Sequence, residues 1–187
     1  MASMILSRFR FCLSRYRRDN DGVAAVEFAL LLPILAVLYL GMFEGAKIYE
    51  GADKTNTAAE SLGDLVSRTR TVSSDELNKI FAISKAIMYP LDESKFTATI
   101  SGIEIDDNGK GKVVWSKKNS GTGLAKGSSY TLPQGLKDNP SKFLVIVETQ
   151  YTHESPLLHS VIASSLEIDH KFAVVPRLSP DIPCSDC

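Results

Sequence analysis

The chain has 187 residues, enough for one folded domain and one membrane segment, and its hydrophobic content of 44% is ordinary for a globular protein. The net charge of -1 is unevenly spread: five arginines and two aspartates give residues 1–22 a charge of +3, which leaves -4 for the rest. No basic stripe with interleaved aromatic residues occurs, which excludes the usual pattern of a DNA- or RNA-binding protein.

A long apolar run directly follows the basic arm. Residues 23–43 read VAAVEFALLLPILAVLYLGMF, and Glu27 is the single charged residue among these 21. As a helix the run would span roughly 30 Å, the thickness of a bilayer core. A core helix of a soluble protein fits poorly, because no face is left for water. Since arginines beside the first span stay in the cytoplasm, we predict a cytoplasmic leader (1–22), a transmembrane helix (23–45) and an extracytoplasmic domain (46–187).

Three features interrupt the apolar run. Glu27 places a carboxylate about one turn into the span, which is costly in lipid and indicates a function, unless snorkelling toward the interface makes the charge tolerable. Pro33 removes one backbone hydrogen bond and favours a local bend. Gly41 and Gly45 have the spacing of small residues that permit close helix approach, so they form a candidate helix-packing face, although Glu44 lies between them.

The segment DGVAAVEF, residues 21–28, resembles a type IV prepilin processing site. In that pattern a basic leader ends in glycine, here Gly22, and the fifth residue of the mature chain is glutamate, here Glu27 counted from Val23. The aromatic Phe28 after the glutamate is similar to the pilins of the tight-adherence (Flp) system. With the rest of the apolar run, the sequence resembles the TadE/TadG-type family of pilin-like proteins.

This resemblance is strong over residues 18–50 and implies processing, partners and a location. A prepilin peptidase would cut between Gly22 and Val23, and glycine suits such a site because it lets the backbone extend into a protease cleft. Glu27 would then pair with the new terminal amine of a neighbouring subunit, so that misaligned subunits leave the charge unpaired. The implied partners are the peptidase, other pilin-like subunits, inner-membrane pilus assembly proteins and lipid. The implied location is the bacterial inner membrane, with entry into an extracellular pilus as a further option.

Two other interpretations of the N-terminal segment stay open. A cleavable signal peptide needs a small-x-small site after its apolar core, and near Gly45-Ala46 the fit is poor because Met42, Phe43 and Glu44 crowd that position. An uncleaved signal anchor is the more serious rival. It would make the chain a single-pass protein whose outer domain binds or senses an envelope partner.

Beyond the span the pattern predicts two helices. Apolar residues at spacings of three and four continue to Arg68, so the first helix becomes amphipathic and can pack on a sheet. Ser73 and Glu76 form a capping box that begins a second helix, and Pro90 ends it.

A strand pair is predicted next. Residues 96–105 alternate between apolar and polar, and the phase changes at Gly102, which predicts a bulge. Asp107-Asn108-Gly109 is typical of a tight turn, and a second strand follows through residues 113–115.

The remaining segments complete the fold class. Residues 119–140 are rich in Gly, Ser, Asn and Pro, as is typical of a long surface loop. Two further alternating strands are predicted over residues 143–151 and 166–174, while residues 156–162 fit either a strand or a short helix. The predicted class is α+β, type IV pilin-like, with helices first and then a mostly antiparallel sheet of about four strands.

No catalytic constellation is recognisable, since G-x-S-x-G and H-E-x-x-H are both absent. The loop 121–128 has its lysine in the wrong place for a phosphate loop, and the acidic cluster 106–108 lacks the closing glutamate of a calcium loop. His170 fits a structural histidine, and Trp115 a buried or sheet-face aromatic. We therefore predict no enzyme, no cofactor and no metal site, and an extracytoplasmic enzyme is the weakest of the three hypotheses.

Cys184 and Cys187 stand near the C-terminus as C-S-D-C, whereas Cys12 lies in the basic arm. Outside the cytoplasm such a pair persists as a disulfide, so we predict a Cys184–Cys187 bond that stiffens the proline-rich tail but stabilises the fold little by chain entropy. A zinc site is disfavoured, because it needs about four ligands and the three histidines are scattered along the chain.

Overall fold

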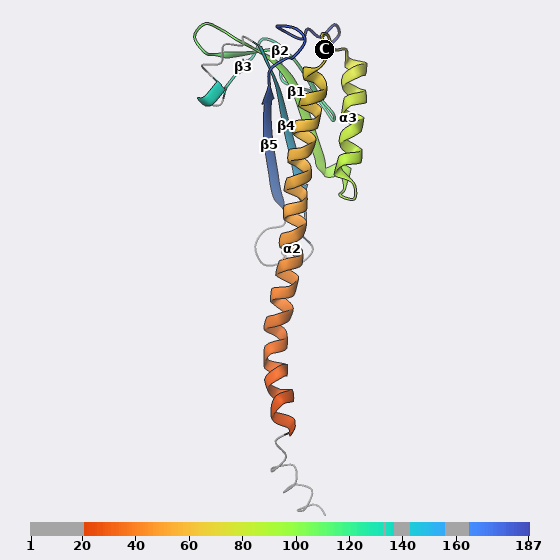
Figure 1. Cartoon of the computed structure of the whole chain (residues 1–187), viewed down its shortest axis with the longest axis vertical. Helices are drawn as coiled ribbons and strands as arrows, with labels where there is room; N and C mark the ends of the chain where they lie inside the picture. Colours follow the sequence, from red (N-terminus) through yellow and green to blue (C-terminus); the bar gives the residue numbers. More distant parts are fainter. Residues whose placement is uncertain (1–20, 133, 137–142, 156–164) are drawn as a thin grey trace, which may run out of the picture. The chain divides into compact units, whose positions relative to one another are not determined.

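The computed structural model describes residues 21–132, 134–136, 143–155 and 165–187. The chain divides into an N-terminal unit, Met1–Gly45, and a C-terminal unit, Ala46–Cys187. Two long helices precede the strands, which confirms the α+β class (Figure 1). The elements are α2 (Asp21–Ser67), α3 (Ser74–Met88), β1 (Phe96–Ile105), β2 (Gly111–Lys118), β3 (Ser129–Tyr130), β4 (Phe143–His153) and β5 (Leu166–Val174), with short 3-10 turns at Glu93–Lys95 and Gln134–Leu136.

Helix α2 belongs to both units. It begins at Asp21, two residues before the predicted start, and ends at Ser67, one residue before the predicted end. Its sequence changes character at the unit boundary, as the pattern predicted. From Ala46 onward it has a buried stripe at helical spacing, which gives it a face to pack on the sheet; the stripe comprises Thr55, Ala58, Ala59, Leu62 and Val66.

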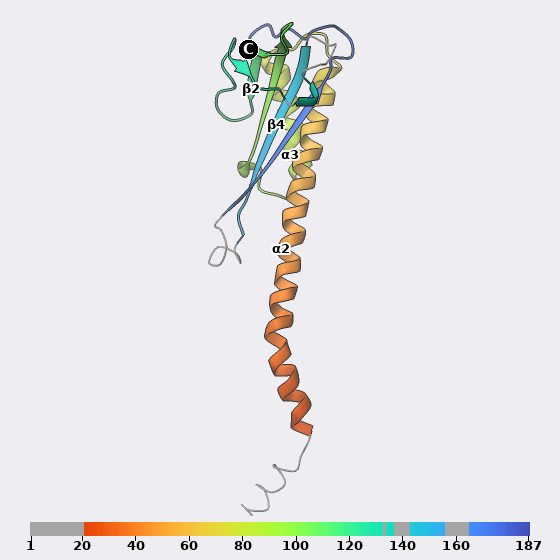
Figure 2. The same cartoon turned by 90° about the vertical axis from the view of Figure 1, so that its left-hand side faces the viewer.

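Helix α3 begins with the predicted capping box. The hydroxyl of Ser73 accepts a hydrogen bond from the amide of Glu76, and the Glu76 carboxylate accepts one from the Ser73 amide at 2.9 Å. At the other end of α3, the Lys54 ammonium of α2 donates to the carbonyls of Ile87 (3.0 Å) and Tyr89 (2.6 Å). A cation is favourable there because the helix C-terminus carries partial negative charge. The contact holds α3 beside α2 (Figure 2).

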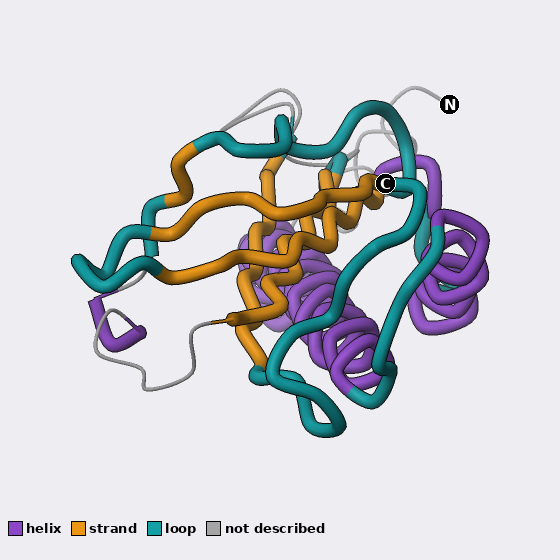
Figure 3. Tube along the Cα trace, turned by 90° about the horizontal axis from the view of Figure 1, so that it is seen from above, coloured by secondary structure: helices purple, strands orange, loops and turns teal. Residues whose placement is uncertain are grey.

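Five strands form one antiparallel sheet in the order β3-β2-β1-β4-β5. Seen from above, they make a curved layer next to the helices (Figure 3). The four predicted strands are β1, β2, β4 and β5. The fifth, β3, has two residues and lies inside the segment 119–140 that we predicted to be loop. The ambiguous residues 156–162 lie outside the described part of the chain.

The hairpin between β1 and β2 has the predicted bulge and turn. The pairing register shifts between Gly102 and Ile103. A Cβ at Gly102 would lie 2.5 Å from Nε1 of Trp115, so only glycine leaves room for the indole. In the turn, the Asp106 carboxylate accepts hydrogen bonds from the amides of Asn108 and Lys110, and Gly109 takes φ of 72°, a conformation that favours glycine.

The sheet carries a hydrophobic core on each face. The larger core lies between the sheet and the helices, and β4 contributes Val145, Val147 and Tyr151 to it. The smaller core includes Leu144 and Ile146 on the opposite face of β4, which is therefore buried on both sides. Leu132, only 4% exposed, belongs to this second core, so the segment predicted as a surface loop is partly interior. In the described residues every buried side-chain nitrogen and oxygen has a hydrogen-bond partner.

Small residues let α2 approach the sheet closely. A Cβ at Gly63 would lie 2.7 Å from the ring of Phe172, and one at Gly51 would lie 3.2 Å from the ring of Tyr151. Between the two glycines, the Thr149 hydroxyl of β4 donates to the Thr55 carbonyl of α2 at 3.2 Å. The helix therefore sits against β4 and β5 at a spacing that larger side chains would increase.

Replacing Gly63 with alanine should lower the unfolding free energy of the C-terminal unit by roughly 1–3 kcal/mol, because the new methyl group overlaps the Phe172 ring. Denaturant unfolding of the full chain in detergent, followed by fluorescence of the sole tryptophan, Trp115, measures the change. The double variant Gly63→Ala/Phe172→Leu should recover part of the loss. An unchanged midpoint for Gly63→Ala would contradict the close packing of α2 on β5.

A polar network crosses the smaller-core face of the sheet. The Tyr130 hydroxyl of β3 donates to the Glu148 carboxylate of β4 at 2.9 Å, and Lys171 of β5 pairs with the same carboxylate at 2.6 Å. Burial, followed by the hydrogen bond to Glu148, raises the pKa of Tyr130 above its ordinary value of 10.0. The folded chain therefore keeps this phenol protonated at a pH where the unfolded chain releases the proton.

The stabilising contribution of Tyr130 should be fully present below about pH 10 and be lost as the pH rises above that value. Unfolding midpoints measured between about pH 8 and about pH 11 should fall less steeply for Tyr130→Phe than for the wild type, because the variant has no proton to lose there. Tyr89→Phe is the matched control, since that side chain is 77% exposed and its slope should equal the wild type's. Parallel slopes for all three proteins would contradict the role of Tyr130.

Candidate functional site

The first part of α2 presents an apolar surface. The helix is long and apolar enough to cross a membrane, and its most apolar window is entirely unburied within the described chain. Large hydrophobic side chains along it are exposed, for example Phe28 at 58% and Met42 at 76%. Such a surface is unfavourable in water, so it requires lipid or other apolar helices around it.

The predicted processing site lies in the first turn of this helix. Gly22 and Val23 follow the first helical residue, Asp21, so their peptide bond is helical rather than extended. A Cβ at Gly22 would meet nothing within 4 Å, and Val23 is 53% exposed. A peptidase would have to unwind this turn, which is easier at glycine because glycine favours the helix less than alanine by about 0.5–1 kcal/mol.

Glu27 and Phe28 follow within the next turn. Glu27 is exposed and lies four residues after Val23, on the same side of the helix. Its neighbours in the run are all uncharged, so no group within that run can neutralise it. The site can therefore accept one cationic group from elsewhere, which is the chemistry expected of a pairing carboxylate.

Gly41 and Gly45 lie at the far end of the apolar run. They are four residues apart, so both open onto one side of α2, and a Cβ at either position would meet nothing within 4 Å. Between them Met42 and Phe43 are exposed, whereas Glu44 is only 5% exposed. The packing role predicted from their spacing stays a prediction.

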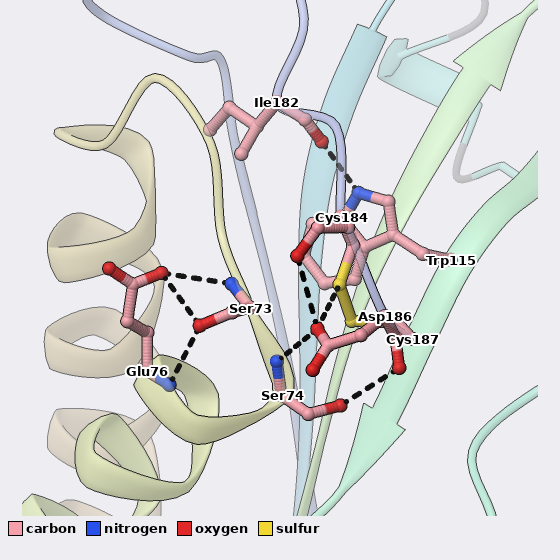
Figure 4. Close-up of a disulfide and its surroundings, with 9 residues drawn as sticks. Ser73, Ser74, Glu76, Trp115, Ile182, Cys184, Asp186 and Cys187 are labelled. Atoms are coloured by element: carbon pink, nitrogen blue, oxygen red, sulfur yellow. Dashed lines mark hydrogen bonds between the residues drawn. A yellow bond between two sulfur atoms is a disulfide. The ribbon is translucent and has the colours of Figure 1, made fainter.

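Cys184 and Cys187 form a disulfide, with their Cα atoms 5.7 Å apart. Sulfur atoms of this pair and the Asp186 carboxylate lie within 4.8 Å of one another, a spacing that suits a metal ligand set. Because both sulfurs are used in the disulfide, neither is the thiolate that a metal would bind. Figure 4 shows that the ring lies against the start of α3, where Ser74 donates to Asp186. Sequence reasoning missed this docking, since nothing in C-S-D-C identifies its partner.

Among the clefts in the described part of the C-terminal unit, two have the volume of a small-molecule site. One, of about 350 Å³, lies on the outer sheet face and is lined by Glu148, His170 and Lys171 among others. The second, of about 540 Å³, lies between α3 and the start of β1 and is lined mainly by polar side chains around Phe81 and Phe96. None of the predicted site residues lines either cleft.

Comparison with known proteins finds a family match for one segment of the chain. Residues 22–60 match the family model described as TadE-like protein. The match begins at the glycine of the predicted processing site and ends in the C-terminal unit, so it confirms the resemblance inferred from the glycine, the glutamate and the apolar run. No curated protein and no solved structure matches the chain. The TadE-like match suggests a protein associated with the tight-adherence pilus, in a structural rather than an enzymatic role, with one candidate membrane helix.

Proposed function

We propose that this chain is a minor pilin- or pseudopilin-like structural subunit of a tight-adherence (Flp-type) pilus assembly system, processed by a prepilin peptidase after Gly22. The observation that carries the proposal is the lone Glu27 carboxylate in an uncovered apolar run that directly follows Gly22, the first residue of the TadE-like segment. Pilus subunits need such a helix because it serves first as a membrane anchor and then as a surface for neighbouring subunits.

The proposed topology follows from charge and length. The basic leader, residues 1–22, stays in the cytoplasm, the helix of residues 23–45 spans the inner membrane, and residues 46–187 lie in the periplasm. Cleavage between Gly22 and Val23 then removes a charge of +3 from the cytoplasmic end. It leaves a single new cation, the Val23 amine, at the start of the helix.

Glu27 then acts as the partner of that amine in a neighbouring subunit. An unpaired carboxylate in the bilayer is unfavourable by about 2.5–3.5 kcal/mol on insertion scales, so a subunit gains by aligning its charge with an amine. Neighbours displaced along the helix axis leave both charges unpaired. The pair therefore favours one axial alignment of neighbouring subunits. Gly41 and Gly45 would let helices approach closely near the periplasmic end of the same interface.

The partners of this mechanism are the prepilin peptidase, other pilin-like subunits and the inner-membrane assembly proteins. A second candidate function is an uncleaved, signal-anchored protein whose periplasmic domain binds an envelope partner. The 350 Å³ cleft on the outer sheet face favours this alternative, because its mixture of acidic, basic and neutral polar side chains could bind a polar ligand. The two functions differ in the fate of the leader.

N-terminal sequencing of the protein isolated from membranes should give a mature chain that begins at Val23. Gly22→Ala should leave the leader attached, because a methyl group at the scissile glycine hinders entry of the backbone into the peptidase. Gly45→Ala, the same change later in the same helix, should be processed normally. An intact leader on the wild type favours the signal-anchored alternative, and a start near residue 46 would contradict the proposed topology.

Glu27→Gln should be cleaved normally but should enter assemblies at least about tenfold less well, which corresponds to about 1.4 kcal/mol of lost pairing energy. Co-purification of the tagged variant with other pilus components, quantified against the wild type, measures the effect. Glu60→Gln, which removes an exposed carboxylate from the C-terminal part of α2, is the control and should assemble normally. Normal assembly of Glu27→Gln would refute the pairing role.

A further inference from the structure

The C-terminal tail crosses the C-terminal unit at the end where α2 terminates, and it closes the core there. The Arg177 amide donates to the carbonyl of Ser67, the last residue of α2, at 2.8 Å, and the Arg177 guanidinium pairs with Asp64 at 2.7 Å. Further along, Ile182 is fully buried in the larger core. Its carbonyl accepts a hydrogen bond from the indole nitrogen of Trp115 at 2.6 Å. The tail thus provides both an apolar side chain and a hydrogen-bond acceptor to the interior.

Residues 181–187, here called the C-terminal latch, also pair with the segment between the two helices. The Val72 amide donates to the Pro183 carbonyl at 3.0 Å, and the Ser185 amide donates to the Val72 carbonyl at 3.2 Å. These bonds form a short parallel bridge between Val72 and Cys184. Because Val72 is itself buried, the bridge satisfies backbone groups that would otherwise be desolvated without partners.

The last contact of the latch is made at the N-terminus of α3. The Ser74 amide donates to the Asp186 carboxylate at 2.7 Å, and the Ser74 hydroxyl donates to the Asp186 carbonyl at 3.2 Å (Figure 4). A carboxylate is favourable at this position, because the free amides of the first turn and the helix dipole both attract negative charge. It supplements the capping box of Ser73 and Glu76, so α3 is capped partly by residues more than a hundred positions away.

The disulfide encloses two of the residues that make these contacts, and Ile182 and Pro183 precede it directly. Cys184 and Cys187 are the ends of a four-residue ring, and Ser185 and Asp186 are the two residues inside it. Once the ring is closed, the Ser185 amide and the Asp186 carboxylate are held in one turn and can reach Val72 and Ser74 together. Open thiols would leave each contact to form separately, at a higher entropic cost.

We propose that the Cys184–Cys187 disulfide is a redox switch for the C-terminal latch: the latch docks on Val72, Ser74 and Trp115 when the pair is oxidised and releases them when it is reduced. Oxidation removes two electrons and two protons from the thiols, and an oxidised dithiol partner or small disulfide accepts them by thiol–disulfide exchange. Dithiothreitol reverses the step and becomes its own cyclic disulfide. The C-terminal unit therefore closes fully only where disulfides persist, which in the proposed topology is the periplasm.

The effect of reduction is local. A ring of four residues constrains the unfolded chain little, so the disulfide acts mainly on the geometry of the latch. The strands β1 and β4 pair over most of their length without any contribution from the tail. Release should therefore loosen the N-terminus of α3 and the surroundings of Trp115, but leave the centre of the sheet intact.

Reduction of the full chain in detergent micelles with excess dithiothreitol tests the switch. Trp115 is the sole tryptophan, so its fluorescence emission should shift to longer wavelength, and its indole N–H should exchange faster with solvent. Hydrogen exchange at the Ser74 amide should accelerate at least about tenfold, while exchange at the Val147 amide in β4 should stay unchanged. Mass spectrometry of the protein before and after treatment establishes the state of the thiols.

Three variants serve as controls. Cys184→Ser/Cys187→Ser should behave like the reduced wild type without any reductant, and Cys12→Ser should keep the full response. Asp186→Ala, which retains the disulfide, should accelerate exchange at Ser74 but leave Trp115 unchanged. The proposal is overturned if reduction leaves both Trp115 and Ser74 unchanged, if Val147 loses protection equally, or if the untreated protein carries free thiols at both positions. Cleavage after Gly22 has no part in these measurements, so they stand apart from the proposed function.

Discussion

The apolar surface of α2 between Val23 and Phe43 is the constraint on which the rest of the molecule depends. No described part of the chain covers it, and transfer of each large aliphatic side chain from water to an apolar medium is favourable by about 1.5–3 kcal/mol. The helix must therefore lie in lipid or among other apolar helices. A helix with these two environments available suits the proposed double role of anchor and assembly surface. In that proposal Glu27, the single carboxylate of the run between Val23 and Phe43, determines which alignments with neighbours are favourable.

The same helix changes its role at the unit boundary. From Ala46 onward its buried face is built from small residues and short aliphatic side chains, with Gly51 and Gly63 against aromatic rings of the sheet. The C-terminal unit thus has its own core, divided between the two faces of β4. It needs no contact with lipid to bury its apolar residues. This separation suits a subunit whose N-terminal helix exchanges one apolar environment for another.

Features set by local sequence were predictable, whereas features set by distant contacts were not. The capping box at Ser73, the register shift at Gly102 and the turn before β2 each depend on a few adjacent residues, and all three were predicted. Burial of Leu132 depends on strands that are remote in sequence, and its polar, glycine-rich surroundings gave no sign of it. Docking of Asp186 on α3 could not be predicted either, because its partner Ser74 is remote in sequence. At the candidate site, the resemblance could be predicted because it depends only on the spacing of the glycine, the glutamate and the apolar run along one continuous segment.

Zero-length crosslinking tests the proposed charge pair most directly. Assemblies formed from a mixture of ¹⁵N-labelled and unlabelled subunits would be treated with a carbodiimide, which joins an amine to a carboxylate only when the two are in contact. The account predicts an amide bond between the Val23 amine and the Glu27 side chain, in peptides that combine one labelled and one unlabelled chain. Crosslinks confined to a single chain, or a Val23 amine that never forms because the leader remains, would contradict it.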